Sequence, residues 1–260
     1  MRAVTLTTDL GAQGYYLAVI KGALLKASPN LNIVDISHDI QNYDIVHGAF
    51  ILKNAWKSFP EGTIHLVAVD NSPDGTTFII AKKEKQYFLC PDNGILSLIF
   101  EELPVEIYRI APYDETTFSL PKIFASTVKK IVNGIPLKQI GTPTEEIVKR
   151  ITLQPVINND SIRGSIIFVD NYENAVVNIT KTIFDNVVGD RPFSLYFKRN
   201  NPILKLSKHY HEVPVGEPLC LFNSAGLLEI AINMGKASGL LGLKKGDTIE
   251  LALRKVQGDD

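Results

Sequence analysis

The chain has 260 residues, of which 45% are hydrophobic and 21% are charged, and its formal net charge is −1. This length allows a large core and predicts two domains. The near-neutral charge gives no reason to expect nucleic acid or an anionic membrane as a partner. No apolar run approaches membrane-spanning length, and no signal-like segment opens the sequence, so we expect a soluble cytoplasmic protein.

The first half of the chain alternates between strand-like and helix-like runs. Strands are predicted at residues 4–8, 32–36, 63–70, 77–81, 87–90 and 105–110, and helices at 15–26, 45–57, 95–102 and 122–132. This alternation predicts an α/β domain with a mainly parallel mixed sheet covered on both faces. The fourth and fifth strands, joined by the polar run 82–86, are predicted to form an antiparallel hairpin.

The second half is richer in short strands. Residues 134–160 contain three prolines and mixed charges, which indicates a connector with a boundary near residue 155. We therefore predict domains at 1–155 and 156–260. Strands are predicted at residues 165–170, 175–180, 193–198, 203–206, 219–223 and 248–253. Short strands broken by turn residues predict a smaller, mostly-β domain, a sandwich or barrel.

The sequence carries no metal or cofactor signature. Cys90 and Cys220 each lie in an apolar run and are expected to be buried free thiols. His209 and His211 would face the same side of a strand, but no third ligand lies near them in the sequence. Three further histidines are isolated and more consistent with structural roles: His38, His47 and His65.

Two aspartates follow predicted strands of the first half. Asp9 ends the run Ala3–Asp9, and Asp70 ends a continuous apolar strand that begins at Ile64. Ligands of open α/β sheets bind outside the carboxyl ends of the strands, and a carboxylate there suits the two hydroxyl donors of a ribose. The structural alternatives are that Asp9 caps the next helix and that Asp70 begins an ordinary turn.

Further polar clusters follow other strands. Residues 170–174 combine an aromatic side chain with amides that could stack on and hydrogen-bond a base, and the small residues of 229–237 would let a ring approach the backbone. Residues 223–226 form a third cluster of small and polar residues. Residues 90–94 read equally well as a turn with a helix cap.

Taken together, these clusters resemble the S-adenosylmethionine hydroxide adenosyltransferase family, which also contains fluorinase and chlorinase. Their order and spacing hold along nearly the whole chain. The matching stretches are Thr7–Gly11, Ile33–Ile40, Tyr43–Ile45, Gly62–Asp70, Pro91–Gly94, Val169–Asn178, Asn223–Ser224 and Glu229–Ala237.

The resemblance implies a homotrimer that binds a nucleoside ligand between the first domain of one subunit and the second domain of its neighbour. It implies that Asp9 holds the ribose hydroxyls and that Tyr43 lies against the ligand. In the second domain, Tyr172 and Asn174 would face the adenine, together with backbone near Ala237. The methionine amino group would meet two further residues, Asp170 and Ser224.

The sequence departs from the family at the water-activating residues. Family hydrolases are expected to use an Asp, an Arg and a His, and Asp70 occupies the Asp position. The Arg position falls on Thr77 or, with a shift of one residue, on Phe78, and the His position falls on Ser119. The chain has no arginine between Arg2 and Arg109. Thr77 and Ser119 would therefore reshape the pocket.

Three functions fit this pattern. The first is hydrolysis of S-adenosylmethionine to adenosine and methionine, with Asp70 as the base; burial without a cationic neighbour would raise its pKa and strengthen it. The second is a homotrimer that binds the nucleoside without catalysis. The third is a related lyase with another nucleophile or substrate. Halogenation fits less well, because an ionised Asp70 would repel a halide.

Overall fold

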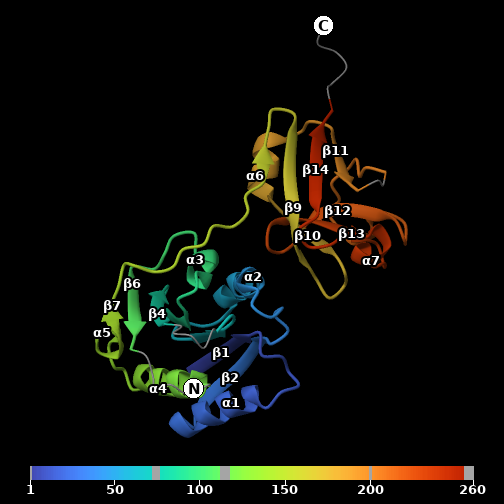
Figure 1. The fold of residues 1–260 in the computed structure, drawn as a ribbon. Coiled ribbons are helices and arrows are strands. Elements are labelled where there is room, and N and C mark those ends of the chain that lie inside the picture. Colours follow the sequence, from blue (N-terminus) through green and yellow to red (C-terminus); the bar gives the residue numbers. More distant parts are fainter. Residues whose placement is uncertain (1, 72–76, 112–117, 199–200, 255–260) are drawn as a thin grey trace. The chain divides into compact units, whose positions relative to one another are not determined.

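The structure is a computed structural model that describes residues 2–71, 77–111, 118–198 and 201–254. The chain divides into two compact units, residues 1–152 and 153–260. Each unit has its own sheet (Figure 1). The first unit has hydrophobic side chains clustered on both faces of its sheet, and the second unit has a hydrophobic core of its own. Within the described ranges, no helix is long and apolar enough to cross a membrane.

The first unit is built on a seven-stranded sheet in the order β2-β1-β3-β5-β4-β6-β7. The strands are β1 Arg2–Thr8, β2 Leu31–Ser37, β3 Ile64–Ala68, β4 Phe78–Lys83, β5 Gln86–Pro91, β6 Glu106–Ile110 and β7 Thr142–Pro143. The pairs β1–β2, β1–β3 and β3–β5 are parallel, whereas β4 is antiparallel to both β5 and β6. The predicted mixed sheet is therefore confirmed, and β4–β5 is the predicted hairpin.

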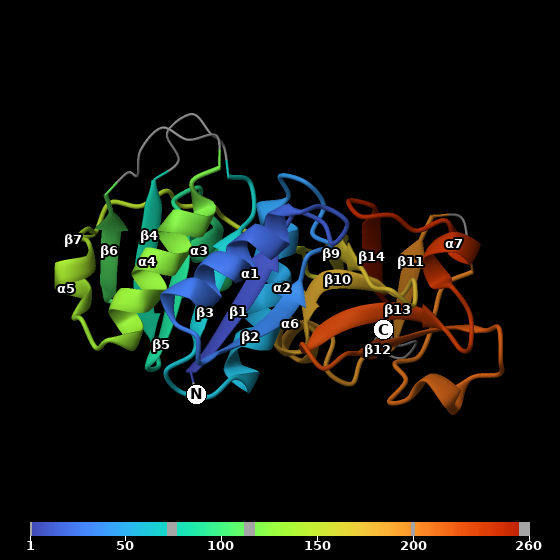
Figure 2. The same ribbon diagram turned by 90° about the horizontal axis from the view of Figure 1, so that it is seen from below.

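Helices cover both faces of this sheet. They are α1 Tyr16–Ala27, α2 Ile45–Ala55, α3 Ile95–Ile99, α4 Leu120–Val132 and α5 Leu137–Ile140. Side chains of β3 alternate between the two faces: Ile64 and Leu66 share one core with α1 and α4, and Val67 shares the other with α2 and α3. Figure 2 shows α1 and α4 side by side across one face.

Several boundaries in the first unit differ from the sequence prediction: β3 ends at Ala68 rather than 70, α2 ends at Ala55 rather than 57, and α4 begins at Leu120 rather than 122. Helix α3 stops at Ile99 rather than 102, because Phe100 adopts extended backbone and its ring packs edge-on against Trp56 and Phe88. The predicted connector 134–160 is not without structure, since it contains α5, β7 and the strand β8 Val156–Ile157. Tertiary packing decides the last two cases.

The second unit is an antiparallel sheet in the order β11-β14-β9-β10-β13-β12, with β8 paired to β9. Its other strands are β9 Ser161–Val169, β10 Ala175–Thr180, β11 Phe193–Phe197, β12 Pro218–Phe222, β13 Leu227–Ile232 and β14 Thr248–Leu253. Strand β9 pairs with β14 along its first half and with β10 along its second half. The sheet curls there into an open half-barrel, which confirms the barrel-like prediction.

Some predictions for the second unit were wrong. Residues 203–206 form no strand and make only isolated bridges, Leu195–Ile203 and Leu206–Cys220. Strand β13 and the helices α6 Lys181–Val187 and α7 Ala237–Leu241 were not predicted. The charged residue Glu229 interrupts the apolar pattern of β13, yet its side chain is buried. Both cysteines are free and buried.

Candidate functional site

Asp9 joins three chain segments at the carboxyl edge of the first sheet. Its Oδ2 accepts hydrogen bonds from the backbone N–H of Tyr43 at 3.0 Å and of Asp70 at 3.1 Å. Both of these residues have left-handed backbone, with φ of 65° and 53°. Such backbone costs about 1–2 kcal/mol in a non-glycine residue, so the Asp9 carboxylate offsets a local strain.

The alternative role of Asp9 as a helix cap does not hold. The residue before α1 is Tyr15, and no side-chain hydrogen bond caps that helix. Asp9 instead contacts Tyr43 and Asp70 directly. All three are site residues predicted from the sequence, and they lie together at this edge of the sheet. Tyr43 is 74% exposed, so its ring is free to meet a ligand.

Asp70 is also held from the other side. Asn93 Nδ2 donates to the carbonyl oxygens of Val69 at 3.0 Å and Asp70 at 3.2 Å, while its Oδ1 accepts from the N–H of Ile95 at 3.1 Å. Asn93 follows β5, the parallel neighbour of β3. The sequence predicted a turn with a helix cap at residues 90–94, but it did not predict the bonds from Asn93 to Val69 and Asp70.

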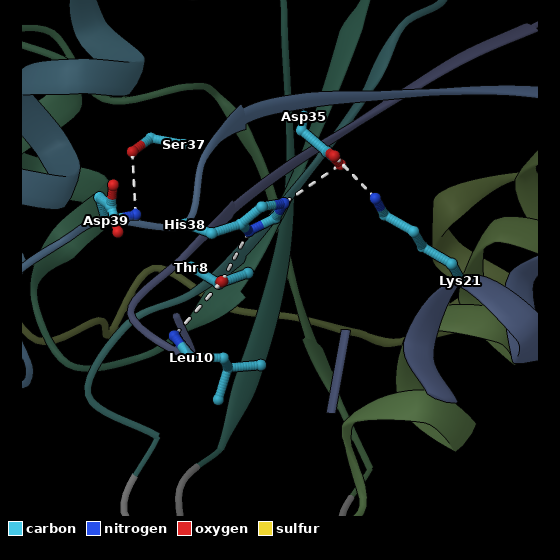
Figure 3. Close-up of polar contacts among 7 residues, drawn as sticks. All are labelled: Thr8, Leu10, Lys21, Asp35, Ser37, His38 and Asp39. Atoms are coloured by element: carbon cyan, nitrogen blue, oxygen red, sulfur yellow. Dashed lines mark hydrogen bonds and ion pairs between the residues drawn. The ribbon is translucent and has the colours of Figure 1, made fainter. Parts of the chain in front are cut away.

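A polar chain behind the end of β1 supports the turn that carries Asp9 (Figure 3). His38 Nδ1 lies 2.9 Å from Thr8 Oγ1, and His38 Nε2 lies 3.1 Å from an oxygen of Asp35. With its proton on Nε2, the imidazole accepts from the Thr8 hydroxyl at Nδ1 and points Nε2 at the Asp35 carboxylate. The backbone oxygen of His38 accepts from Gly11 N–H at 3.1 Å. His38 therefore has a structural role.

Lys21 completes this chain. Its Nζ lies 2.7 Å from Asp35 Oδ2. Partial burial acts to raise the pKa of Asp35, but hydrogen bonds from Lys21 and His38 outweigh it and hold that pKa below its ordinary value. Asp35 is therefore ionised at neutral pH and orients the imidazole.

The two residues at the expected Arg and His positions begin secondary-structure elements. Thr77 precedes β4, and its carbonyl oxygen accepts from Asp92 N–H at 2.7 Å. Ser119 precedes α4, whose first N–H groups bond to its carbonyl oxygen. Phe78 is buried in the core, so it is no pocket residue. The loop after Asp70 at residues 72–76 and the segment 112–117 lie outside the described residues.

In the second unit, Asp170 orders the loop between β9 and β10. Its Oδ1 accepts from the N–H groups of Tyr172 at 2.9 Å and Asn174 at 2.8 Å, and its Oδ2 accepts from Asn174 Nδ2 at 3.0 Å. Tyr172 is 77% exposed and Asn174 only 7%. The ring can therefore stack on a base, whereas the Asn174 amide is already bonded to Asp170.

Glu173 connects this loop to the segment before α7. Its carboxylate accepts from Gly239 N–H at 3.1 Å and pairs with Lys236 at 2.9 Å, while its carbonyl oxygen accepts from Ser238 N–H at 2.7 Å. The hydrogen bond from Lys236 holds the pKa of Glu173 below its ordinary value, against the opposing effect of desolvation and with the help of the Gly239 N–H. These bonds join Glu173 to residues 236–239, so Tyr172 and Ala237 each lie next in sequence to a residue of this contact.

Ser224 lies in the turn between β12 and β13, which Asn223 organises. Asn223 Oδ1 accepts from the N–H groups of Ala225 and Leu227 at 3.0 and 3.2 Å, and its Nδ2 donates to Glu229 at 3.2 Å. Ser224 itself is exposed. The turn thus presents the Ser224 hydroxyl to solvent.

Glu229 is 3% exposed and also accepts from the Tyr210 hydroxyl at 2.8 Å. Burial raises its pKa, and the nearby Asp170 carboxylate adds to the rise against the opposing hydrogen bonds. Burial, together with Glu229, raises the pKa of Tyr210 to about 12. The sequence analysis included Glu229 only in the segment of small residues 229–237. The signal that could have predicted this buried polar network is a charged residue inside an apolar run.

His209 and His211 do not lie on a strand, the arrangement in which their rings would face the same side. Residues Tyr210–Glu212 form a short 3₁₀ helix, and the rings of His209 and His211 stack with centroids 5.3 Å apart. Among the described residues, no group of three or more His, Cys, Asp or Glu side chains is arranged to hold a metal ion.

The sheet, the half-barrel and these polar loops define an α/β ligand-binding protein with a second β-rich unit. The family model of the SAM hydroxide adenosyltransferase N-terminal domain matches residues 4–141, and that of the C-terminal domain matches residues 164–250. The chain belongs to the SAM hydroxide adenosyltransferase family.

Relatives and solved structures match along almost the whole chain. The chain is 26% identical to (R)-S-adenosyl-L-methionine hydrolase of Thermus thermophilus, over 96% of this chain and 100% of the relative. It is 29% identical to the hydrolase of the same name from Methanocaldococcus jannaschii, over 95% of each. Fluorinase of an Actinoplanes species is 24% identical, over 95% of this chain and 96% of the relative. A crystal structure of an uncharacterized conserved Thermotoga maritima protein superposes with a TM-score of 0.86 at 30% identity, covering 96% of this chain and 99% of that one.

Proposed function

We propose that the protein is an enzyme that hydrolyses S-adenosylmethionine to adenosine and L-methionine. The hydrolase names of the full-length relatives support this activity. The observation that carries it is the position of Asp70, held at a strand end in left-handed backbone beside Asp9. A carboxylate so placed can act as a base at the end of a ribose.

The difficult part of the reaction is to make water nucleophilic, because the sulfonium sulfur is already a good leaving group. The water oxygen bonds to C5′ of the ribose, the C5′–S bond breaks, and its electron pair goes to the sulfonium sulfur, which leaves as neutral methionine. The proton of the water passes to Asp70 and then to solvent. A positioned general base typically contributes ~10²–10⁴-fold to the rate.

The other site residues would bind the substrate. Asp9 uses one oxygen for two backbone N–H groups, and a carboxylate offers about four acceptor positions, which leaves acceptors for the ribose hydroxyls. Tyr43 would lie against the ligand, with Thr77 and Ser119 along the pocket. In the second unit, Tyr172, Asn174 and the backbone at Ala237 would receive the adenine. Two residues, Asp170 and Ser224, would meet the methionine ammonium group.

We propose further that the protein is a cytoplasmic homotrimer. The family resemblance supports a site that combines the first unit of one subunit with the second unit of its neighbour. The division of the candidate residues between the two units agrees with this arrangement. The substrate would be the sole small-molecule ligand, with no separate cofactor.

A second candidate function is nucleoside binding without turnover. It is favoured by one observation: residues 3–108 contain no arginine, and a serine, Ser119, stands at the position where a histidine is expected. A protein of this kind would bind S-adenosylmethionine and release it unchanged.

Mass spectrometry of the purified protein incubated with S-adenosylmethionine tests the proposal. We expect adenosine and methionine in equal amounts, at a rate that falls ~10²–10⁴-fold in Asp70→Asn. Recovery of intact, protein-bound S-adenosylmethionine would instead establish the binding function. Full hydrolysis by Asp70→Asn would exclude Asp70 as the base.

A further inference from the structure

The backbone of Asp70 is fixed on both sides by side chains from other strands. Its N–H donates to Asp9 Oδ2, and its carbonyl oxygen accepts from Asn93 Nδ2. The carbonyl oxygen of the preceding Val69 accepts from the same Asn93 nitrogen. Because the backbone of a residue fixes the direction of its Cα–Cβ bond, these bonds set the direction from which the Asp70 carboxylate extends.

The orientation of the Asn93 amide follows from its partners. Two of them are carbonyl oxygens, which need a donor, and the third is the Ile95 N–H, which needs an acceptor. Only the –NH2 group can donate, so one orientation satisfies all three partners and the reverse satisfies none. The three bonds therefore specify an asparagine rather than an aspartate at this position.

The local chain keeps Asn93 in place. Gly94 has φ of 101°, and a Cβ there would collide with the Arg150 side chain, so the glycine is required both for its backbone and for its size. Ile95 then begins α3, and its N–H binds back to Asn93. Both ends of the Asn93 side chain are thus fixed to backbone.

We propose that Asn93 is a positioning residue for catalysis: it holds the left-handed backbone of Asp70 so that the carboxylate faces the attacking water. This inference rests on the proposed hydrolase function. Asn93 acts only through Asp70 and contacts no reacting atom. Misplacement of a catalytic group by about 1 Å can lower the rate ~10²-fold.

Asn93→Asp tests the proposal, because it keeps size and the acceptor for Ile95 but replaces the donor with an oxygen facing two carbonyl oxygens. We expect kcat to fall ~10²-fold, with KM for S-adenosylmethionine and Kd for adenosine changed far less. Asn93→Ala, which removes the donating amide without adding charge, should lower kcat in the same direction if the Asp variant folds poorly.

Gln86→Glu is the matched control. Gln86 also donates its amide to a backbone oxygen, that of Phe59 at 3.2 Å, but at the opposite end of β5. The Gln86→Glu variant should lower the melting temperature at least as much as Asn93→Asp does, and it should leave kcat near that of the wild type. A kcat loss equal to that of Asn93→Asp would mean that general destabilisation, not positioning, causes the effect.

The double variant Asn93→Asp with Asp70→Asn separates positioning from other roles. If Asn93 acts through Asp70, the Asn93 change has little further effect on kcat once Asp70 is replaced. An undiminished additional loss would overturn the proposal. Wild-type protein without turnover would refute the hydrolase function, and a crystal structure of Asn93→Asp then decides the positioning: Asp70 still at positive φ would overturn it.

Discussion

The candidate residues of the first unit and those of the second unit are held in different ways. In the first unit, Asp9 bonds to residues 34 and 61 positions away, and Asn93 bonds to Asp70 across 23 positions. In the second unit, Asp170 bonds only two and four positions along the chain. The residues of the first unit depend on the sheet that brings strand ends together, whereas the second-unit loop is largely ordered by itself.

This difference predicts how each unit responds to mutation. A change in the first unit should move several chain segments, and with them Asp70, the proposed base. A change in the Asp170 loop should stay local and alter mainly ligand affinity. Glu173 is the exception in the second unit, because it bonds to Gly239 across 66 positions.

Asp9→Ala should have the largest effect. It removes the acceptor of both left-handed residues and the proposed ribose contact, and hydrogen bonds to charged groups contribute ~1.5–3 kcal/mol each. We expect kcat/KM to fall ~10³-fold or more, from that loss combined with misplacement of Asp70. Steady-state kinetics measure the loss of kcat/KM, and calorimetry measures the loss of stability.

Asp9→Asn is the control, because its amide oxygen can still accept from Tyr43 and Asp70. It should unfold near the wild-type temperature and show mainly weaker ligand binding. Equal destabilisation by the Asn and Ala variants would contradict the role of Asp9 in holding the backbone.

His65 gives the next largest effect, on stability at low pH. It is buried in β3, where it contacts Thr5 Oγ1 and Gln86 Oε1 at 2.7 Å each, and burial lowers its pKa to about 4. In the unfolded chain the pKa of His65 is ~6.5, so on acidification the unfolded chain takes up a proton on His65 before the folded chain does. Stability therefore falls as the pH drops from ~6.5 to ~4.

The expected loss from this histidine is about 3 kcal/mol at pH 4. When His65→Gln is unfolded in urea between pH 7 and pH 4, its free energy of unfolding should fall from its own value at pH 7 by correspondingly less than that of the wild type. His209→Gln, at an exposed histidine, is the control and should retain the wild-type slope. An unchanged slope in His65→Gln would refute the burial argument.

Asp170→Asn should change affinity more than stability. The amide oxygen keeps the N–H groups of Tyr172 and Asn174, and the bond from Asn174 Nδ2 is kept if the Asn174 amide turns its oxygen to the new –NH2 group. The negative charge proposed to meet the substrate ammonium is lost. We expect Kd for S-adenosylmethionine to rise ~10-fold or more, since a charge-assisted bond contributes ~1.5–3 kcal/mol. Adenosine lacks the ammonium, so its Kd should change little; an equal loss for both ligands would contradict this role.

His38 should give the smallest effect. His38→Asn can keep the contact to Thr8, whereas His38→Gln can keep the contact to Asp35. If the Thr8 contact supports the Asp9 turn, the Gln variant should lose more turnover than the Asn variant, with about 1 kcal/mol of stability at stake. The reverse order would assign the support to Asp35.

The sequence predicted what is local. Strand alternation, the β4–β5 hairpin and the positions of Asp9 and Asp70 after their strands all follow from periodicity and turn residues. The bonds from Asp9 to Tyr43 and from Asn93 to Asp70 could not be predicted, because they depend on strand order and on left-handed backbone. Strand β13 was missed for a related reason: the buried Glu229 is stabilised by Tyr210 and Asn223, which only the fold brings near.

Hydrolysis in water enriched in ¹⁸O tests the central claim most directly. If Asp70 activates water for attack at C5′, the label appears in the 5′-hydroxyl of adenosine and not in methionine, and labelled adenosine forms far more slowly with Asp70→Asn. Adenosine without the label, or S-adenosylmethionine recovered unchanged after long incubation with the wild-type protein, would contradict the account.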